Sequence, residues 1–265
     1  SSNRGVILQD YVNRRFRNEL VGQDPLQREH LWERVWELDR IERFAPNLTH
    51  LVDVALWDIG AKQAGLPVHQ LLGGYRTKLP AYASTVTYSS ISEFLDIADQ
   101  ALALGYPMIK LHAFGNAKRD AELCLALRAH VGPDVELMYD GSAAFDLQDA
   151  VYLGHALDEA NYLWYEEPMR EFSVTAYKWL GERVRVPLLL GEVTDGSHMN
   201  AGDFVATGVA TSLRTSTFLK GGFTGAMRIA HLADAYHLRA EVHGMGLESA
   251  HLCMAIKNTT AYESL

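Results

Sequence analysis

Three carboxylates at one spacing are the residues of this sequence best suited to hold a metal ion. Asp140, Glu166 and Glu192 lie 26 residues apart, and each closes a short apolar run. Carboxylate oxygens are hard donors, which favour Mg²⁺ over Zn²⁺. Acidic residues also follow strands simply because loops are solvated, but the shared interval favours one metal held by three successive strands.

The apolar runs before these acids are typical of β-strands, and each is followed by a stretch with helical periodicity. This alternation predicts a parallel α/β fold, and eight strands would complete a (β/α)8 TIM-type barrel, in which the strand C-termini meet at one mouth. The predicted strands are Ala81–Ser84, Met108–His112, Leu137–Asp140, Leu163–Glu166, Leu188–Glu192, Thr211–Thr215, Ala240–His243 and Thr259–Glu263. The predicted helices are Ser92–Leu104, Lys118–His130, Leu147–Glu159, Val174–Glu182, Met199–Ala206, Thr224–Tyr236 and Glu248–Lys257.

Further polar residues lie near the ends of the predicted strands. Lys110 and His112 share one face of the second strand, since side chains two apart point the same way. His243 closes the seventh strand and Glu263 the eighth. Strands two and seven lie on opposite sides of a barrel mouth, so the two histidines would face each other across the metal, which suits acid–base chemistry. A solvated lysine and structural histidines are the alternative interpretation.

The region around the sixth strand carries two more cations and two glycines. Arg214 and Lys220 could bind a carboxylate of a substrate. Gly221 and Gly222 could approach a phosphate at a helix N-terminus, or they could form a tight turn into the helix that follows. A pair of glycines does not decide between the two.

The first part of the chain differs from the rest. Residues 1–78 show helical patterns, notably at Gln27–Leu38 and Leu48–Leu72, and no clear strand. We therefore predict a helical N-terminal segment in residues 1–78 and a barrel in residues 79–265.

Composition narrows the class of protein. The 265 residues are 48% hydrophobic, enough to bury the core of a barrel, and carry a net charge of −9. That charge argues against nucleic acid and anionic membrane as partners. No apolar run is long enough to span a bilayer, and the N-terminus lacks the layout of a signal peptide. Cys124 and Cys253 lie far apart in helical patterns, so we expect small core residues and a cytoplasmic location.

Five motifs resemble those of the enolase superfamily, in its mandelate racemase and muconate-lactonizing branch. They are Ala55-Leu56-Trp57-Asp58-Ile59-Gly60-Ala61-Lys62, Leu71-Leu72-Gly73-Gly74, Tyr165-Glu166-Glu167-Pro168, Gly191-Glu192 and Lys220-Gly221-Gly222-Phe223-Thr224-Gly225. Their order and spacing make the resemblance specific, and it covers nearly the whole chain. It implies a (β/α)8 barrel preceded by part of an α+β capping domain. On that resemblance, the chain starts inside the cap and stops just after the eighth strand.

The resemblance also implies roles for the strand-end residues. Asp140, Glu166 and Glu192 would be the Mg²⁺ ligands. Lys110 and His112 resemble the family's strand-two Lys-x-Lys, in which the second lysine is a base and the first tunes it. His112 would therefore be the base in this chain.

The last two strands are implied to carry the remaining catalytic groups. His243 matches the histidine that acts as the opposing acid or base, and Glu263 matches the acid that hydrogen-bonds the developing enolate, for which it would be neutral. One departure concerns the strand-six aspartate that orients the histidine in the family. Ser216 stands at that position, and no acid lies between Asp203 and Asp234. A serine cannot stabilise an imidazolium as a carboxylate does, so the usual dyad looks broken.

The expected activity is Mg²⁺-dependent abstraction of the proton α to a carboxylate, because a bound cation and a hydrogen-bond donor can stabilise the charge that develops. The resemblance favours dehydration of a sugar acid to a 2-keto-3-deoxy acid. Racemisation or epimerisation of a hydroxy acid is the alternative, and a non-catalytic metal-binding barrel is the alternative from another class. Family resemblance also implies a homo-oligomer with a small-molecule carboxylate substrate.

Overall fold

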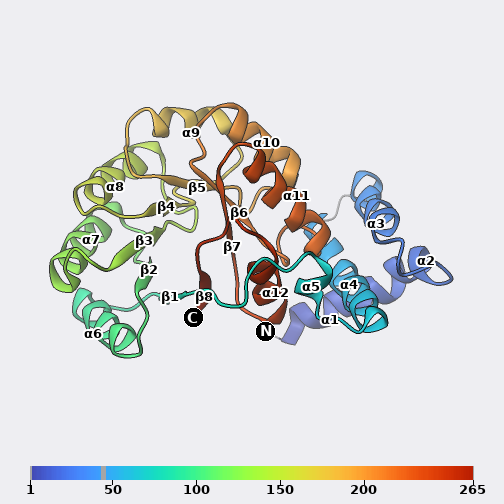
Figure 1. Ribbon diagram of the computed structural model, residues 1–265. Helices are drawn as coiled ribbons and strands as arrows, with labels where there is room; N and C mark the ends of the chain where they lie inside the picture. Colours follow the sequence, from blue (N-terminus) through green and yellow to red (C-terminus); the bar gives the residue numbers. More distant parts are fainter. Residues whose placement is uncertain (1, 43–45, 265) are drawn as a thin grey trace.

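Eight parallel strands alternate with helices in the part of the chain that the structure describes, residues 2–42 and 46–264 of a computed structural model (Figure 1). Their order is β7-β6-β5-β4-β3-β2-β1-β8, so β8 pairs with β1 and the sheet forms a nearly closed barrel. The predicted fold class is confirmed. The strands are β1 (Ala81–Ser84), β2 (Met108–His112), β3 (Glu136–Asp140), β4 (Trp164–Glu166), β5 (Leu188–Leu190), β6 (Ser212–Thr215), β7 (Arg239–Val242) and β8 (Tyr262–Ser264).

The helices between the strands begin and end within a few residues of the predicted bounds. Four of them start at the side-chain caps Ser90, Asn116, Asp146 and Ser173, each of which accepts a hydrogen bond from a backbone N–H in the first turn. The helices are α6 (Ile91–Ala103), α7 (Ala117–Val131), α8 (Leu147–Glu159), α9 (Val174–Gly181), α10 (His198–Ala206), α11 (Gly222–Ala235) and α12 (Leu247–Ala255).

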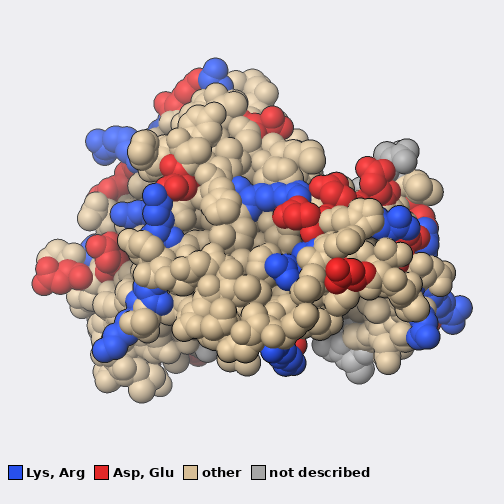
Figure 2. All heavy atoms as spheres, turned by 45° about the vertical axis from the view of Figure 1, so that its right-hand side comes forward, with Lys and Arg blue, Asp and Glu red and all other residues tan. Residues whose placement is uncertain are grey.

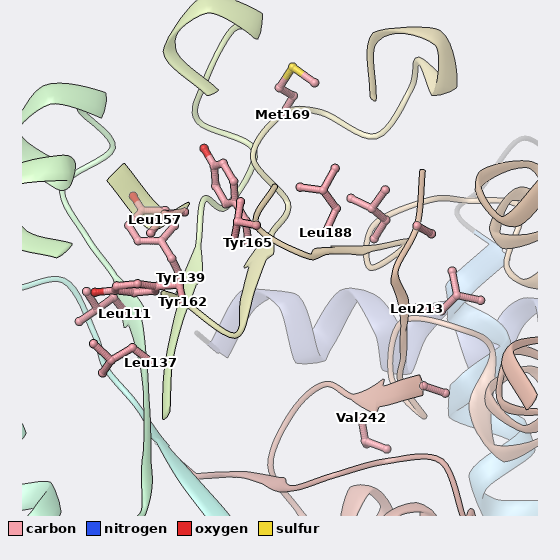
Figure 3. Close-up of a cluster of buried hydrophobic side chains, with 14 of the residues drawn as sticks. Leu111, Leu137, Tyr139, Leu157, Tyr162, Tyr165, Met169, Leu188, Leu213 and Val242 are labelled. Atoms are coloured by element: carbon pink, nitrogen blue, oxygen red, sulfur yellow. The ribbon is translucent and has the colours of Figure 1, made fainter. Parts of the chain in front are cut away.

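Two apolar layers set the orientation of every strand. The side chains that face the helices form the main core, and Figure 3 shows members of it from β2 to β7. The alternate side chains face the barrel axis and form a separate cluster of Tyr82, Met108, Met138, Trp164, Leu189 and Ala261. Two residues closer to the C-terminal ends of these strands, the side chains that face the barrel axis are polar. They are Ser84, Lys110, Asp140, Glu166 and Glu263. A polar layer therefore rests on an apolar floor at the C-terminal end of the strands.

The N-terminal part is helical in its described residues and lies beside α11 and α12 (Figure 1). Its own core contains Phe16, Leu31, Val35, Leu38, Val52 and Leu56. The elements before residue 21 were not among the helical patterns singled out from the sequence. The elements are α1 (Ser2–Tyr11), the π-helix η1 (Val12–Phe16), α2 (Arg17–Leu20), α3 (Arg28–Glu42), the 3₁₀-helix η2 (Pro46–Thr49), α4 (His50–Ala64) and α5 (Val68–Leu71).

This N-terminal part contacts the barrel at the start of α11. Asp53 accepts hydrogen bonds from the backbone N–H of Thr224, at 3.0 Å, and from its hydroxyl. Trp32 donates to the Gly221 carbonyl at 2.7 Å. Gly222 has φ +81°, and a Cβ there would lie 2.2 Å from the Asp53 carboxylate, so this position requires glycine. The two glycines therefore form a tight turn against the N-terminal helices, which argues against a phosphate site.

The surface carries charges of both signs, and the two cysteines lie in the core. Basic and acidic side chains are interspersed on the face drawn in Figure 2. Cys124 and Cys253 are buried free thiols, as predicted. Across the described residues, no helix combines the length and the apolar character needed to cross a membrane.

Candidate active site

The three regularly spaced carboxylates lie together at the C-terminal ends of neighbouring strands. Asp140 and Glu166 are the last residues of β3 and β4, and they pair in register across the sheet. Glu192 follows β5 by two residues. All three side chains are buried. The predicted strand ends therefore do converge on one mouth.

Two fully buried cations lie among these acids. Lys110 Nζ is 3.1 Å from Asp140 Oδ2, 3.0 Å from Glu166 Oε2 and 2.8 Å from Glu263 Oε1. An ammonium group has three protons, so these contacts use its whole capacity as a donor. Lys110 also lies 5.9 Å from the ring centre of Tyr82, on the apolar floor. Lys110 is thus a charge held inside the cluster.

Arg214 is the second cation, and it reaches the cluster from β6. Its Nε is 2.5 Å from Glu166 Oε1 and 3.4 Å from Glu192 Oε2, and one terminal nitrogen is 3.2 Å from Glu263 Oε2. The sequence suggested that Arg214 could bind a substrate carboxylate. In the structure this guanidinium is engaged by protein carboxylates and buried, so it does not offer a free cation to a ligand.

Within the described residues of this cluster, the four carboxylates face two cations. Burial raises the pKa of Glu166 well above its usual value, although Arg214 and Lys110 lower it. Burial raises the pKa of Asp140, but Lys110 and His112 hold it below its usual value. Burial acts in the same way on Glu192, yet the His243 ring beside it lowers the pKa to about 2. Buried charges are costly unless they are paired, so a divalent cation would balance this cluster.

The two histidines lie at the two ends of the cluster and are partly exposed. His112 Nε2 is 3.0 Å from Asp140 Oδ2, and Nδ1 is 2.6 Å from the Thr85 carbonyl. His243 Nδ1 is 3.2 Å from Glu192 Oε1 and 3.7 Å from a Glu263 oxygen. About 30% of each ring is exposed, 27% for His112 and 30% for His243, so both can reach a molecule bound at the mouth.

Ser216 follows β6 directly, where the family has its orienting aspartate. Its hydroxyl oxygen accepts hydrogen bonds from the backbone N–H groups of Phe218 and Leu219, at 3.1 and 3.2 Å. The serine therefore stabilises its own turn. The acidic neighbours of the His243 ring are instead Glu192 and Glu263.

Glu263 differs from the expectation of a neutral acid. It accepts hydrogen bonds from Ser84 Oγ at 3.0 Å and from the Gly244 N–H at 2.9 Å, in addition to its contacts with both buried cations. Burial raises its pKa, but Arg214 and then Lys110 hold the pKa well below the usual range. This arrangement favours an ionised Glu263 over the expected neutral acid, because two cations and two hydrogen-bond donors surround the carboxylate.

The acidic cluster fits a hard divalent cation such as Mg²⁺, and two of the three predicted ligands, Glu166 and Glu192, lie close together in it. Ligand atoms of Glu166, Glu192 and His243 lie within 4.8 Å of one another, whereas Asp140 is not part of that group. One Asp140 oxygen faces Lys110 and His112, and the other accepts from Ser142. Glu166 Oε1 is buried and lies 2.5 Å from Arg214 Nε, although this contact does not have hydrogen-bond geometry. A buried carboxylate oxygen is a suitable ligand for a divalent cation, which would share it with the guanidinium.

The sequence did not identify some of the residues that position the site side chains. Ser84 and Thr85 follow one another at the end of the first strand and contact Glu263 and His112. Glu171 and Lys220 are buried and hold the loop that carries Glu192. Lys220 had been considered as a carboxylate binder, but its ammonium donates to Thr194. No spacing or motif could have revealed these partners, because they come from different strands and loops.

Comparison with known proteins identifies the family. The family model "Mandelate racemase / muconate lactonizing enzyme, N-terminal domain" matches residues 4–73, and "Enolase C-terminal domain-like" matches residues 93–265. The D-galactarolactone cycloisomerase of Agrobacterium fabrum is 29% identical over 241 residues, which cover 87% of this chain and 64% of that protein. The chain thus spans somewhat less than two thirds of that relative.

Two solved structures share this fold, and both are complexed with magnesium. The D-glucarate dehydratase of Agrobacterium tumefaciens, complexed with magnesium, has a TM-score of 0.91 and 33% identity, covering 96% of this chain and 71% of that one. The L-talarate dehydratase of Polaromonas sp. JS666, complexed with Mg and L-glucarate, has a TM-score of 0.87 and 27% identity, covering 100% and 72%. The chain therefore belongs to the enolase superfamily, in its mandelate racemase and muconate-lactonizing branch.

Proposed function

We propose that this protein is a Mg²⁺-dependent lyase that removes the proton α to the carboxylate of a sugar acid and expels the β-hydroxyl, giving a 2-keto-3-deoxy acid. The observation that carries the proposal is the buried cluster of four carboxylates and two cations with a partly exposed histidine at each end. A purely structural ion-pair network would have no need of two imidazoles at its solvent side. The related dehydratases that are complexed with magnesium support the same conclusion.

Asp140, Glu166 and Glu192 would hold the metal, from the ends of β3 and β4 and from the loop after β5. Bound there, Mg²⁺ would offset the second negative charge that a substrate carboxylate acquires when its α-proton leaves. Lys110 and Arg214 lower the pKa of Glu263, the remaining acid, and hold its carboxylate in place. Because Lys110 donates hydrogen bonds to Asp140 and Glu166 and forms an ion pair with Glu263, we assign it a positioning and charge-balancing role in place of a base.

The proton transfers fall to the two histidines. One imidazole takes the α-proton, and the C–H electrons are shared with the substrate carboxylate as an enediolate. These electrons then form the carbon–carbon double bond between Cα and Cβ as the β C–O bond breaks. The opposite histidine gives its proton to the departing hydroxyl, which leaves as water. The enol product then tautomerises to the 2-keto-3-deoxy acid. Glu263, held ionised by its four donors, would fix Lys110, Arg214 and the turn after β7.

Racemisation or epimerisation uses the same first step, but the opposite histidine returns a proton to carbon. We favour dehydration because both of the magnesium complexes compared above are named dehydratases. We also keep three proposals made from the sequence: a helical capping segment in residues 1–78 with the barrel in 79–265, a homo-oligomeric state and a cytoplasmic location.

The test is to incubate the protein with Mg²⁺ in D₂O and a panel of mono- and diacid sugars, and to follow α-deuteration and keto-acid formation together. Keto acid formed from a panel member supports the dehydratase. Deuteration without keto acid would indicate a racemase or epimerase. Neither signal, in a protein that binds Mg²⁺, would indicate a non-catalytic metal-binding barrel.

A further inference from the structure

Glu192 differs from the other two proposed ligands in how its backbone is held. Asp140 and Glu166 end their strands and are fixed by the sheet, in which they are paired. Glu192 lies beyond Leu190, the last residue of β5, and Gly191 before it turns the chain out of the strand with φ +98°. No strand pairing therefore fixes this residue, and its position depends on contacts from other loops.

Glu171 supplies such contacts from the loop between β4 and α9. Its Oε1 accepts a hydrogen bond from the Gly191 N–H at 2.5 Å, and its Oε2 accepts one from the Val193 N–H at 3.1 Å. The Val193 N–H belongs to the peptide that directly follows the Glu192 Cα, and the Gly191 N–H belongs to a peptide one residue further back. A single buried carboxylate thus holds the backbone before and after Glu192.

Lys220 holds the next residue of the same loop from the opposite direction. This lysine is buried just before α11, and its Nζ donates to the Thr194 carbonyl at 2.9 Å and to the Thr194 hydroxyl at 3.0 Å. Burial raises the pKa of Glu171 to about 7 and lowers that of Lys220 to about 8, and each charge opposes the shift of the other. The loop is therefore held by an acid and a base, and the charge of each favours the ionised form of the other.

We propose that Glu171 is a positioning residue that, together with Lys220, fixes the loop from Gly191 to Thr194 so that Glu192 is preorganised to bind a divalent cation. The inference rests on the proposed metal site, but it concerns residues that touch neither metal nor substrate. Groups that orient a ligand contribute to metal affinity because an unfixed ligand must lose its freedom when the metal binds.

Glu171→Gln is the variant that tests this role. Glutamine has the same length, but its amide nitrogen is a donor and would face one of the two backbone N–H donors, so one of the two hydrogen bonds must be lost. Glu241→Gln is the matched control. Glu241 is equally buried and accepts hydrogen bonds from the Thr259 hydroxyl and from the backbone and hydroxyl of Thr260, away from the Glu192 loop.

The measurement is the Mg²⁺ dissociation constant by titration calorimetry, together with amide hydrogen exchange of residues 191–194 and thermal unfolding without metal. We expect Glu171→Gln to weaken Mg²⁺ binding by roughly 10- to 100-fold, as is typical of residues that orient a ligand, and to speed exchange in this loop. Glu241→Gln should lower the unfolding temperature but bind Mg²⁺ like the parent. A purely structural Glu171 would behave in the same way as Glu241.

Parent-like affinity and exchange in a folded Glu171→Gln protein would overturn the inference and leave the metal site intact. If that variant does not fold, Lys220→Met decides the question, since it removes both donors to Thr194. Weaker Mg²⁺ binding would support the inference, and unchanged affinity would overturn it. A parent protein that binds no Mg²⁺ would overturn the proposed metal site and this inference together.

Discussion

Lys110→Met would remove one of the two cations of the acidic cluster while keeping the length of the side chain. In the parent, the fully buried Nζ lies within 3.1 Å of three carboxylate oxygens. Removing one partner of a buried ion pair costs about 3–5 kcal/mol, because the remaining charge stays buried and unpaired. We expect a loss of that size in the free energy of unfolding of the metal-free protein.

Mg²⁺ should restore part of this loss, since a divalent cation balances the acids that Lys110 no longer pairs. A ligand present at 100 times its dissociation constant stabilises a folded protein by ~2.7 kcal/mol. The stabilisation by a fixed concentration of Mg²⁺ should be larger in the variant than in the parent, because the variant cluster carries one more uncompensated negative charge. Urea unfolding with EDTA and with Mg²⁺ measures both quantities.

Lys62→Met is the matched control for the same chemical change. Lys62 is exposed and pairs with Asp58 one helical turn away on α4, at 2.6 Å. An exposed pair of this kind contributes roughly 0.2–1 kcal/mol, so the control should unfold almost like the parent at either metal concentration. The reasoning is refuted if Lys110→Met is as stable as Lys62→Met in EDTA, or if Mg²⁺ stabilises the two equally.

Three further changes test other parts of the structure. Burial raises the pKa of Asp53 to about 6, above its unfolded value of about 3.9, so its contribution to stability is complete below about pH 4 and is lost as the pH rises through 6. Relative to the parent, Asp53→Asn should therefore gain ~2 kcal/mol of unfolding free energy between pH 4 and pH 7, and a difference independent of pH would contradict this. Glu192→Gln should weaken Mg²⁺ binding in calorimetry by more than the roughly 10- to 100-fold expected for a residue that only orients a ligand, and full retention would exclude it as a ligand. His112→Ala and His243→Asn should each abolish or redirect the exchange of a substrate α-proton with D₂O, and parent-like exchange in both would remove their acid–base assignment.

The sequence was sufficient to predict the barrel because, in this fold, each apolar run marks a strand and the end of each run marks the barrel mouth. A parallel strand covered on both faces is a short apolar run, and its C-terminal end marks the mouth. Asp140 and Glu166 were therefore placed correctly by the point at which an apolar run ends. The same rule extended β5 to Glu192, whereas the strand ends at Leu190 because Gly191 leaves the extended conformation.

The pairing of charges within the site could not be predicted in the same way. Arg214 was visible as a cation near the end of the sixth strand, but its partners come from β4, β8 and the loop after β5. Which acid a buried cation contacts depends on how side chains reach across the barrel, and sequence separation does not determine this. The ionised state that the structure favours for Glu263 was not foreseen for that reason, since Arg214 comes from β6, Lys110 from β2 and the Gly244 donor from the loop after β7.

The serine at position 216 shows why an altered motif should be judged by the whole site. The sequence suggested a broken dyad, because no carboxylate was available on the sixth strand. In the folded chain the imidazole of His243 still has acidic neighbours, but they are Glu192 and Glu263, which also contact Arg214. Because the sixth strand offers no acid, the carboxylates beside His243 are those of the buried cluster. The position of one of them, Glu192, depends on the loop that Glu171 and Lys220 hold.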